Sequence, residues 1–178
     1  FEYKKCDFVR SYNPKVDVSL DQIKEAAQTI NGAKKPMIIV GHGALLGDAQ
    51  KEVLELAEKA KIPVATTWLG ASAFPARHDL FKGMVGMHGS YAPNLMTNEC
   101  DVLIAIGMRF DDRVTGDLKR YAKQAKIVHF ELDFSELDKN VFAHFPVLGN
   151  CKETLTSLNR MIIESDGRPD WFNVWNEL

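Results

Sequence analysis

The 178 residues of this sequence suffice for one domain that buries a hydrophobic core without disulfide bonds or metals. A hydrophobic share of 46%, a charged share of 26% and a formal net charge of -2 are typical of a soluble globular protein. The 22 basic residues are scattered, which argues against nucleic acid as a partner, and no signal peptide or apolar run of the roughly 18 residues needed for a membrane span is present.

The three cysteines, Cys6, Cys100 and Cys151, are odd in number and far apart, and none belongs to a CxxC pair. We therefore expect no disulfide framework and no metal site, and a cytoplasmic location fits best. The sequence begins at Phe1 and ends in an aromatic tail with Trp171, Phe172 and Trp175, so we expect it to be a piece of a longer protein.

Residues 1–18 have an irregular pattern and predict a connector from an earlier domain. Ser19 then has capping-box spacing to Gln22 and begins a predicted helix that ends at Asn31-Gly32. Its apolar residues recur at helical intervals, at Leu20, Ile23, Ala27 and Ile30.

Short apolar runs predict buried strands at 36–40, 62–67, 102–106, 126–132 and 145–148. Helices are predicted between or after them, at 48–61, 92–98, in one turn beyond Gly116, and at 152–163. This alternation predicts an α/β fold, a Rossmann-like three-layer sandwich with a mainly parallel sheet of about six strands.

Gly167, Arg168 and Pro169 mark the end of the predicted domain, which spans 19–165. We expect residues 166–178 to be the start of a linker to a missing C-terminal domain. The aromatic tail is either a severed contact between domains or a terminal helix that packs back on its own core.

The glycines at 41, 43 and 47 resemble a relaxed dinucleotide fingerprint, in which bare backbone lets a phosphate approach a helix N-terminus. A nicotinamide site also needs an acidic residue at the end of the following strand, where Thr66, Thr67 and Trp68 stand instead. This disfavours a standard NAD site and leaves a purely structural turn as an alternative.

Four glycine-bearing or charged segments follow predicted strands, at 66–70, 86–89, 107–113 and 131–133. In a parallel sheet they would share one edge, where ligands bind. Arg109 and Arg113 suit a pyrophosphate, and Glu131 or Asp133 suits ribose or ribityl hydroxyls. The alternative for 107–116 is a solvated turn whose charges pair with one another.

No catalytic motif accompanies these residues. His88 lies in a glycine-rich loop, and the other four histidines have no partner at triad or metal spacing. The residues alone therefore predict a cofactor-binding platform without a catalytic centre of its own.

Three motifs taken together resemble the central domain of the acetolactate synthase (acetohydroxyacid synthase) catalytic subunit: Gly86-Met-His-Gly89, Gly107-Met-Arg-Phe-Asp-Asp-Arg-Val-Thr-Gly116 and His129-Phe-Glu-Leu-Asp133. The resemblance implies an enzyme that condenses a hydroxyethyl unit, made from pyruvate on thiamine diphosphate, with a second 2-ketoacid in branched-chain amino-acid synthesis. The central domain of that family binds FAD, which takes no net redox part.

The resemblance also implies which residues contact the cofactor and the substrate. Arg113 and Met87 would lie near the active-site entrance, where Arg113 would hold the carboxylate of the incoming ketoacid and Asp112 would orient it. The residues expected to line FAD are Gly41, Gly43, Thr66, Leu69, His88, Gly107, Arg109, Arg113, Val114 and Glu131.

In that family, thiamine diphosphate and Mg²⁺ are held by the preceding and following domains, whose activating glutamate and GDG motif do not occur in this sequence. The resemblance therefore implies an inactive fragment of an enzyme that forms homo-oligomers and meets a regulatory subunit. Three positions depart from the family pattern: Leu46, Glu136 and Asn150. The alternatives are a nucleotide-binding or structural central domain of another thiamine diphosphate-dependent carboligase, such as a glyoxylate carboligase or sulfoacetaldehyde acetyltransferase relative.

Overall fold

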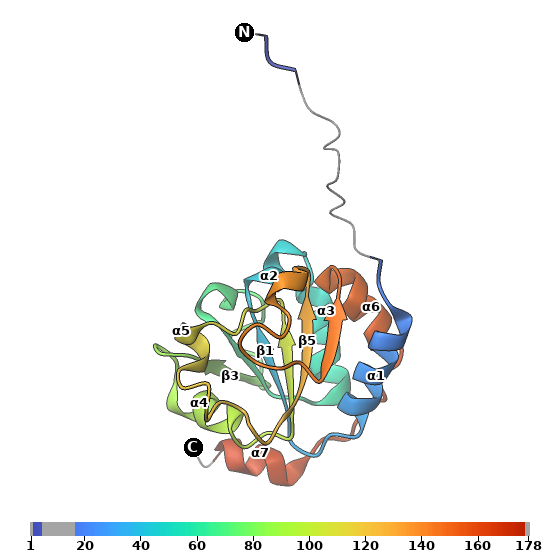
Figure 1. The fold of residues 1–178 in the computed structure, drawn as a ribbon. Coiled ribbons are helices and arrows are strands. Elements are labelled where there is room, and N and C mark those ends of the chain that lie inside the picture. Colours follow the sequence, from blue (N-terminus) through green and yellow to red (C-terminus); the bar gives the residue numbers. More distant parts are fainter. Residues whose placement is uncertain (1, 5–16, 177–178) are drawn as a thin grey trace.

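A computed structural model of the chain describes residues 2–4 and 17–176, so most of the predicted connector lies outside the described residues. At its centre is a parallel sheet of six strands in the order β3-β2-β1-β4-β5-β6 (Figure 1). The strands are β1 Pro36–Val40, β2 Val64–Thr66, β3 Phe81–Met84, β4 Val102–Ile106, β5 Lys126–Glu131 and β6 Phe145–Leu148. This architecture confirms the predicted α/β, Rossmann-like fold.

Helices cover both faces of the sheet (Figure 1). On one face, helices α1, α3 and α6 share a core with Ile38 and Val40 of β1, and on the other face α4 and α7 pack with Met37 and Ile39. Successive strand residues therefore alternate between two cores, as the pleat requires. The helices are α1 Leu20–Asn31, α2 His42–Leu46, α3 Gln50–Ala60, α4 Tyr91–Thr97, α5 Asp112–Thr115, α6 Cys151–Asn159 and α7 Pro169–Asn176, with the 3₁₀ turns η1 Trp68–Gly70 and η2 Phe134–Glu136.

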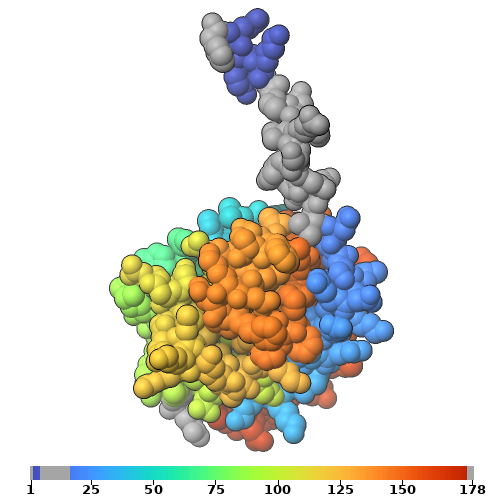
Figure 2. All heavy atoms as spheres, viewed as in Figure 1, coloured from blue at the N-terminus to red at the C-terminus, as the bar shows by residue number. Residues whose placement is uncertain are grey.

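Helix α1 shows how the local sequence sets an element. The Ser19 hydroxyl accepts a hydrogen bond from the Gln22 N–H at 3.4 Å, which confirms the predicted N-cap. Ile23 and Ile30 are fully buried at helical spacing on the inner face. Helix α6 packs beside α1. The segment that includes η2 and β6 forms the orange surface next to the blue surface of α1 in Figure 2.

Three elements differ from the sequence-based prediction. Strand β3 was not predicted, because it is an edge strand of four half-buried residues in which Gly83 adopts φ +109°. Helix α2 occupies the expected glycine turn, and no side chain caps it. Helix α5 precedes Gly116, whereas the prediction placed a helical turn after that glycine.

Helix α7 packs across the amino ends of the strands, at the bottom of Figure 1. Trp171 is 3% exposed, and its indole N–H donates to the Pro36 carbonyl oxygen at 2.9 Å. Arg168 donates to the carbonyl oxygens of Ala33 at 2.9 Å and Ala60 at 2.7 Å. Of the two alternatives for the aromatic tail, the structure shows a terminal helix on the chain's own core. Within residues 2–4 and 17–176, no helix is long and apolar enough to cross a membrane.

Candidate functional site

A cavity of about 840 Å³ opens beyond the carboxyl ends of the strands. It lies where the strand order reverses between β1 and β4, the place at which open α/β sheets bind ligands. Residues at the carboxyl ends of five strands form its wall, which consists of His42, Gly43, Leu46, Thr67, Trp68, Leu69, His88, Gly107, Met108, Arg109, Asp111, Arg113, Val114 and Glu131. The expected convergence of strand ends is therefore present in the fold.

Most of the residues singled out from the sequence meet at this cavity. Eleven residues were expected to contact FAD or the substrate. Eight of them line the wall, namely Gly43, Leu69, His88, Gly107, Arg109, Arg113, Val114 and Glu131. The other three, Gly41, Thr66 and Met87, lie next to the wall residues His42, Thr67 and His88 in the chain but are not part of the wall.

The glycines form the floor of the cavity by backbone-to-backbone packing. The Gly43 N–H donates to the Gly107 carbonyl oxygen at 2.8 Å, so this amide is committed within the protein. A Cβ atom at Gly41 would lie 2.4 Å from that same oxygen, and Gly107 itself adopts φ +56°. The glycines are therefore required by the close approach of the turns after β1 and β4.

Thr66 and Met87 lie off the wall for different reasons. Thr66 is 1% exposed, and its hydroxyl has no partner among the described residues, while Thr67 faces the cavity because neighbouring strand residues point to opposite sides. The Met87 side chain is 61% exposed. Its backbone N–H donates to the Arg113 carbonyl oxygen at 2.8 Å, which joins the 86–89 loop to α5.

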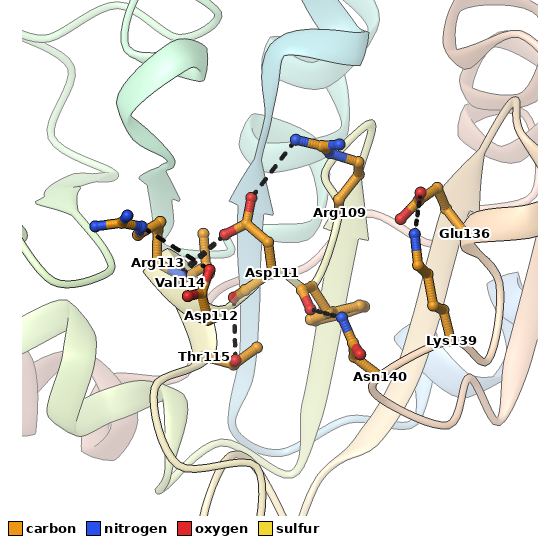
Figure 3. A network of polar contacts seen from close by, with 10 residues as sticks. Arg109, Asp111, Asp112, Arg113, Val114, Thr115, Glu136, Lys139 and Asn140 are labelled. Carbon is orange, nitrogen blue, oxygen red and sulfur yellow. Dashed lines mark hydrogen bonds and ion pairs between the residues drawn. The ribbon is translucent and has the colours of Figure 1, made fainter.

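Asp111 organises the charged segment after β4 (Figure 3). One of its carboxylate oxygens caps α5 by accepting from the N–H groups of Arg113 at 3.1 Å and Val114 at 3.2 Å. The other oxygen lies 3.8 Å from the Arg109 guanidinium, and the Arg113 guanidinium lies 3.9 Å from Asp112. These ion pairs are long and exposed, so both arginines keep donors for an anionic ligand.

Of the two candidate acceptors after β5, only Glu131 lines the cavity. One Glu131 oxygen accepts from the N–H groups of Leu132 at 2.8 Å and Asp133 at 3.2 Å, and the other lies 3.9 Å from the His129 ring. Asp133 instead accepts from the backbone and hydroxyl of Ser135, which lowers the pKa of its carboxyl group.

An apolar part of the wall was not predicted from the sequence. Trp68 and Leu46 are 68% and 77% exposed, and the Trp68 ring contacts the His88 ring edge-on, with centroids 6.1 Å apart. Large exposed apolar side chains grouped around a cavity mark a binding surface. The other wall residues that were not individually assigned to the ligand are His42, Thr67, Met108 and Asp111, of which the last three lie in the segments predicted to share the ligand-binding edge. Only the position of Trp68 directly after a predicted strand could have signalled this surface.

Two of the three departures from the family pattern lie away from the wall. Asn150 caps α6 by accepting from the Lys152 N–H at 2.9 Å, and Glu136 pairs with Lys139 at 2.7 Å (Figure 3). Leu46, by contrast, lines the cavity and adds apolar surface to it.

The described part of the chain contains no cluster of three or more histidine, cysteine or acidic side chains that could hold a metal ion. Cys100 and Cys151 are buried and free, and burial raises the pKa of each thiol to about 12. A thiol with such a pKa is not an activated nucleophile.

The doubly wound sheet and the cavity at its switch point define a Rossmann-like ligand-binding domain. Residues 23–158 match the family described as thiamine pyrophosphate enzyme, central domain. The chain belongs to this family.

Curated relatives are similar over nearly the whole chain. A probable acetolactate synthase large subunit from Methanocaldococcus jannaschii is 48% identical over 94% of this chain and 29% of its own length. The acetolactate synthase isozyme 3 large subunit of Escherichia coli is 37% identical over 92% of this chain, and the acetolactate synthase large subunit of Haemophilus influenzae is 34% identical over all of it. The chain spans about three tenths of the length of these relatives, 30% and 31% for the last two.

Proposed function

We propose that this chain is the FAD-binding central domain of an acetolactate synthase large subunit. The observation that supports the proposal best is the cavity at the switch point, whose wall combines two loosely paired arginines, two carboxylates and a group of exposed apolar side chains. Its volume of about 840 Å³ lies within the usual range of roughly 300–1,000 Å³ for ligand sites.

The chemistry of the wall fits each part of FAD. Arg109 and Arg113 offer guanidinium donors to a diphosphate, and Glu131 offers an acceptor to ribityl or ribose hydroxyls. Trp68, Leu69 and Val114 supply apolar surface for a flat ring system. Gly41 and Thr66 belong to the same proposal as residues next to the wall, because each directly precedes a wall residue, His42 or Thr67.

In the complete enzyme, the proposed substrate-side residues are Arg113 and Met87. Arg113 is exposed and sits on the short helix α5, and the Met87 N–H is bonded to its carbonyl oxygen. A guanidinium there suits the carboxylate of a 2-ketoacid. Thiamine diphosphate and Mg²⁺ would be held by other domains, and the assembled enzyme would act in branched-chain amino-acid synthesis as a homo-oligomer with a regulatory subunit. A cytoplasmic location is part of this proposal.

Titration of the chain with FAD, followed by quenching of flavin fluorescence, tests the cofactor. We expect saturable quenching by one FAD per chain, and no competition from NAD. Binding of ADP without binding of FAD would support the alternative, a nucleotide-binding module of another thiamine diphosphate-dependent carboligase. No binding of either nucleotide would support a structural module.

An activity assay tests the second part of the proposal. The 178-residue chain, supplied with pyruvate, thiamine diphosphate, Mg²⁺ and FAD, is expected to form no acetolactate. Acetolactate formation above the protein-free control would contradict the assignment of the catalytic groups to other domains.

A further inference from the structure

We propose that His129 and Asn140 are positioning residues that clamp the backbone of 108–110 and thereby aim Arg109 and Asp111 at the cavity. The inference rests on the proposed function for its ligand, FAD. Its structural part, the clamp on the backbone, can be tested without any ligand.

Arg109 is not held in place by its own side chain. That side chain is 63% exposed, and its ion pair with Asp111 is 3.8 Å long. An exposed pair of this length contributes little to the stability of one geometry. The direction of Arg109 therefore depends on the backbone that carries it.

In the segment after β4, residues 108–111, buried side chains alternate with more exposed ones. Met108 and Phe110 are 3% and 4% exposed and belong to the core beneath, although Met108 also forms part of the cavity wall. Arg109 and Asp111 line the cavity with exposed side chains. A twist of this segment would turn the arginine away from the wall. The carbonyl groups of Met108 and Phe110 lie before and after Arg109 in the chain. Hydrogen bonds to both of them would prevent such a twist.

His129 holds the first of these carbonyl groups. Its ring is fully buried on β5, and its Nε2 atom lies 2.8 Å from the Met108 oxygen. Since a carbonyl oxygen only accepts, Nε2 carries the proton and donates. The same ring packs edge-on against Phe110, with centroids 4.9 Å apart. Burial lowers the pKa of His129, which keeps the ring neutral and in this donor form.

Asn140 holds the second carbonyl group. Its side-chain amide donates to the Phe110 oxygen at 2.7 Å from the loop before β6, beside the charged segment in Figure 3. The segment begins at Gly107, whose N–H donates to Phe130 and whose oxygen accepts from Gly43. Three successive anchors, at Gly107, Met108 and Phe110, thus fix the segment between β4 and α5.

Matched variants distinguish the effect of the donated hydrogen bond from the effect of side-chain packing. In His129→Gln, the amide nitrogen can take the place of Nε2 and keep the hydrogen bond, whereas in His129→Asn the shorter side chain places its amide near the Nδ1 position and loses it. His129→Leu keeps most of the volume without a donor. Asn140→Asp replaces the second donor by an acceptor that repels the Phe110 oxygen.

The first measurement is hydrogen exchange of the ligand-free chain, read as peptides that cover 107–116 and, as a folding control, 20–31. We expect His129→Leu, His129→Asn and Asn140→Asp to speed exchange in 107–116 roughly tenfold, because each loses one hydrogen bond to the backbone of this segment, and to leave 20–31 unchanged. His129→Gln is expected to stay within about twofold of the parent chain. Equal exchange in His129→Gln and His129→Asn would overturn the clamp.

The second measurement is the FAD titration on the same variants. We expect the Kd for FAD to rise about tenfold in His129→Asn and Asn140→Asp and to recover in His129→Gln. If the parent chain does not bind FAD, the proposed function fails while the exchange experiment still decides the clamp. If exchange rises but FAD affinity is unchanged, the clamp exists but does not aim Arg109 at the ligand, and the inference is wrong.

Discussion

The Gly43 N–H donates to the Gly107 carbonyl oxygen at 2.8 Å, which joins the turn after β1 directly to the turn after β4. This contact lies at the switch point of the sheet and forms the floor of the cavity. It leaves no room for side chains between the two turns: a Cβ atom at Gly43 would lie 2.8 Å from the Gly107 Cα atom. The shape of the candidate site thus depends on two glycines 64 positions apart in the chain.

Substituting these glycines should destabilise the fold. We expect Gly41→Ala or Gly43→Ala to lower the free energy of unfolding by roughly 1–3 kcal/mol, because the added methyl group overpacks the junction of two backbones. Urea denaturation measures the change. Gly32→Ala is the matched control, since φ at Gly32 is -84° and its nearest neighbour would be 3.4 Å away. Equal losses in all three variants would contradict this packing argument.

The two wall arginines should act differently. We expect Arg109→Ala to weaken FAD binding about tenfold to a hundredfold, the effect of losing charge-assisted hydrogen bonds of roughly 1.5–3 kcal/mol. In the complete enzyme, Arg113→Ala should lower kcat/KM for the second ketoacid even where FAD still binds. Flavin fluorescence and steady-state kinetics measure the two effects.

Arg120→Ala is the control for both arginine variants, because Arg120 is exposed, pairs with Asp117 and lies outside the cavity wall. It should bind FAD like the parent chain. A comparable loss in Arg120→Ala would mean that general positive charge, and not the cavity, attracts the cofactor.

Removing the Trp171 indole should destabilise the whole domain. We expect Trp171→Ala to lower the free energy of unfolding by about 3–5 kcal/mol, because a side chain that is 3% exposed leaves a cavity and the Pro36 carbonyl loses its donor. Thermal or urea denaturation measures this loss. Val174→Ala on the same helix, 40% exposed, should cost less than 1 kcal/mol. Equal free energies of unfolding in the two variants would mean that the packing of α7 does not stabilise the domain.

The buried His129 predicts a loss of stability in acid. Burial lowers the pKa of its ring below the ordinary value of 6.5, and this effect outweighs the opposing influence of the Met108 carbonyl and the Glu131 charge. The unfolded chain then binds a proton that the folded chain does not, so the contribution is intact above about pH 6.5 and is lost as the pH falls towards the folded-state pKa. Urea denaturation between pH 7.5 and 5 should show a flatter profile for His129→Gln than for the parent chain.

Much of the fold could be predicted because local patterns are strong. The run from Val102 to Ile106 is apolar at every position, and it is the central strand buried on both faces. Ser19 and Gln22 mark the start of α1 at the observed residue. Strand β3 escaped prediction because Gly83 and partial burial remove the pattern that identifies a strand.

The sequence by itself determined which segments meet at the carboxyl edge of the sheet, since the residues that follow a buried strand, such as Arg109, Asp111 and Arg113, lie at that edge in any parallel sheet. Only the tertiary structure decided which side chains reach the cavity: Thr67 faces it and Thr66 does not, and Glu131 lines it while Asp133 turns to Ser135. The hydrogen bond between His129 and Met108, and the packing of Gly43 on Gly107, also depend on how distant segments meet. Local periodicity specifies the type of each element and the face that it buries. Contacts between distant segments fix the orientation of each side chain at the site, and no short stretch of sequence contains both partners of such a contact.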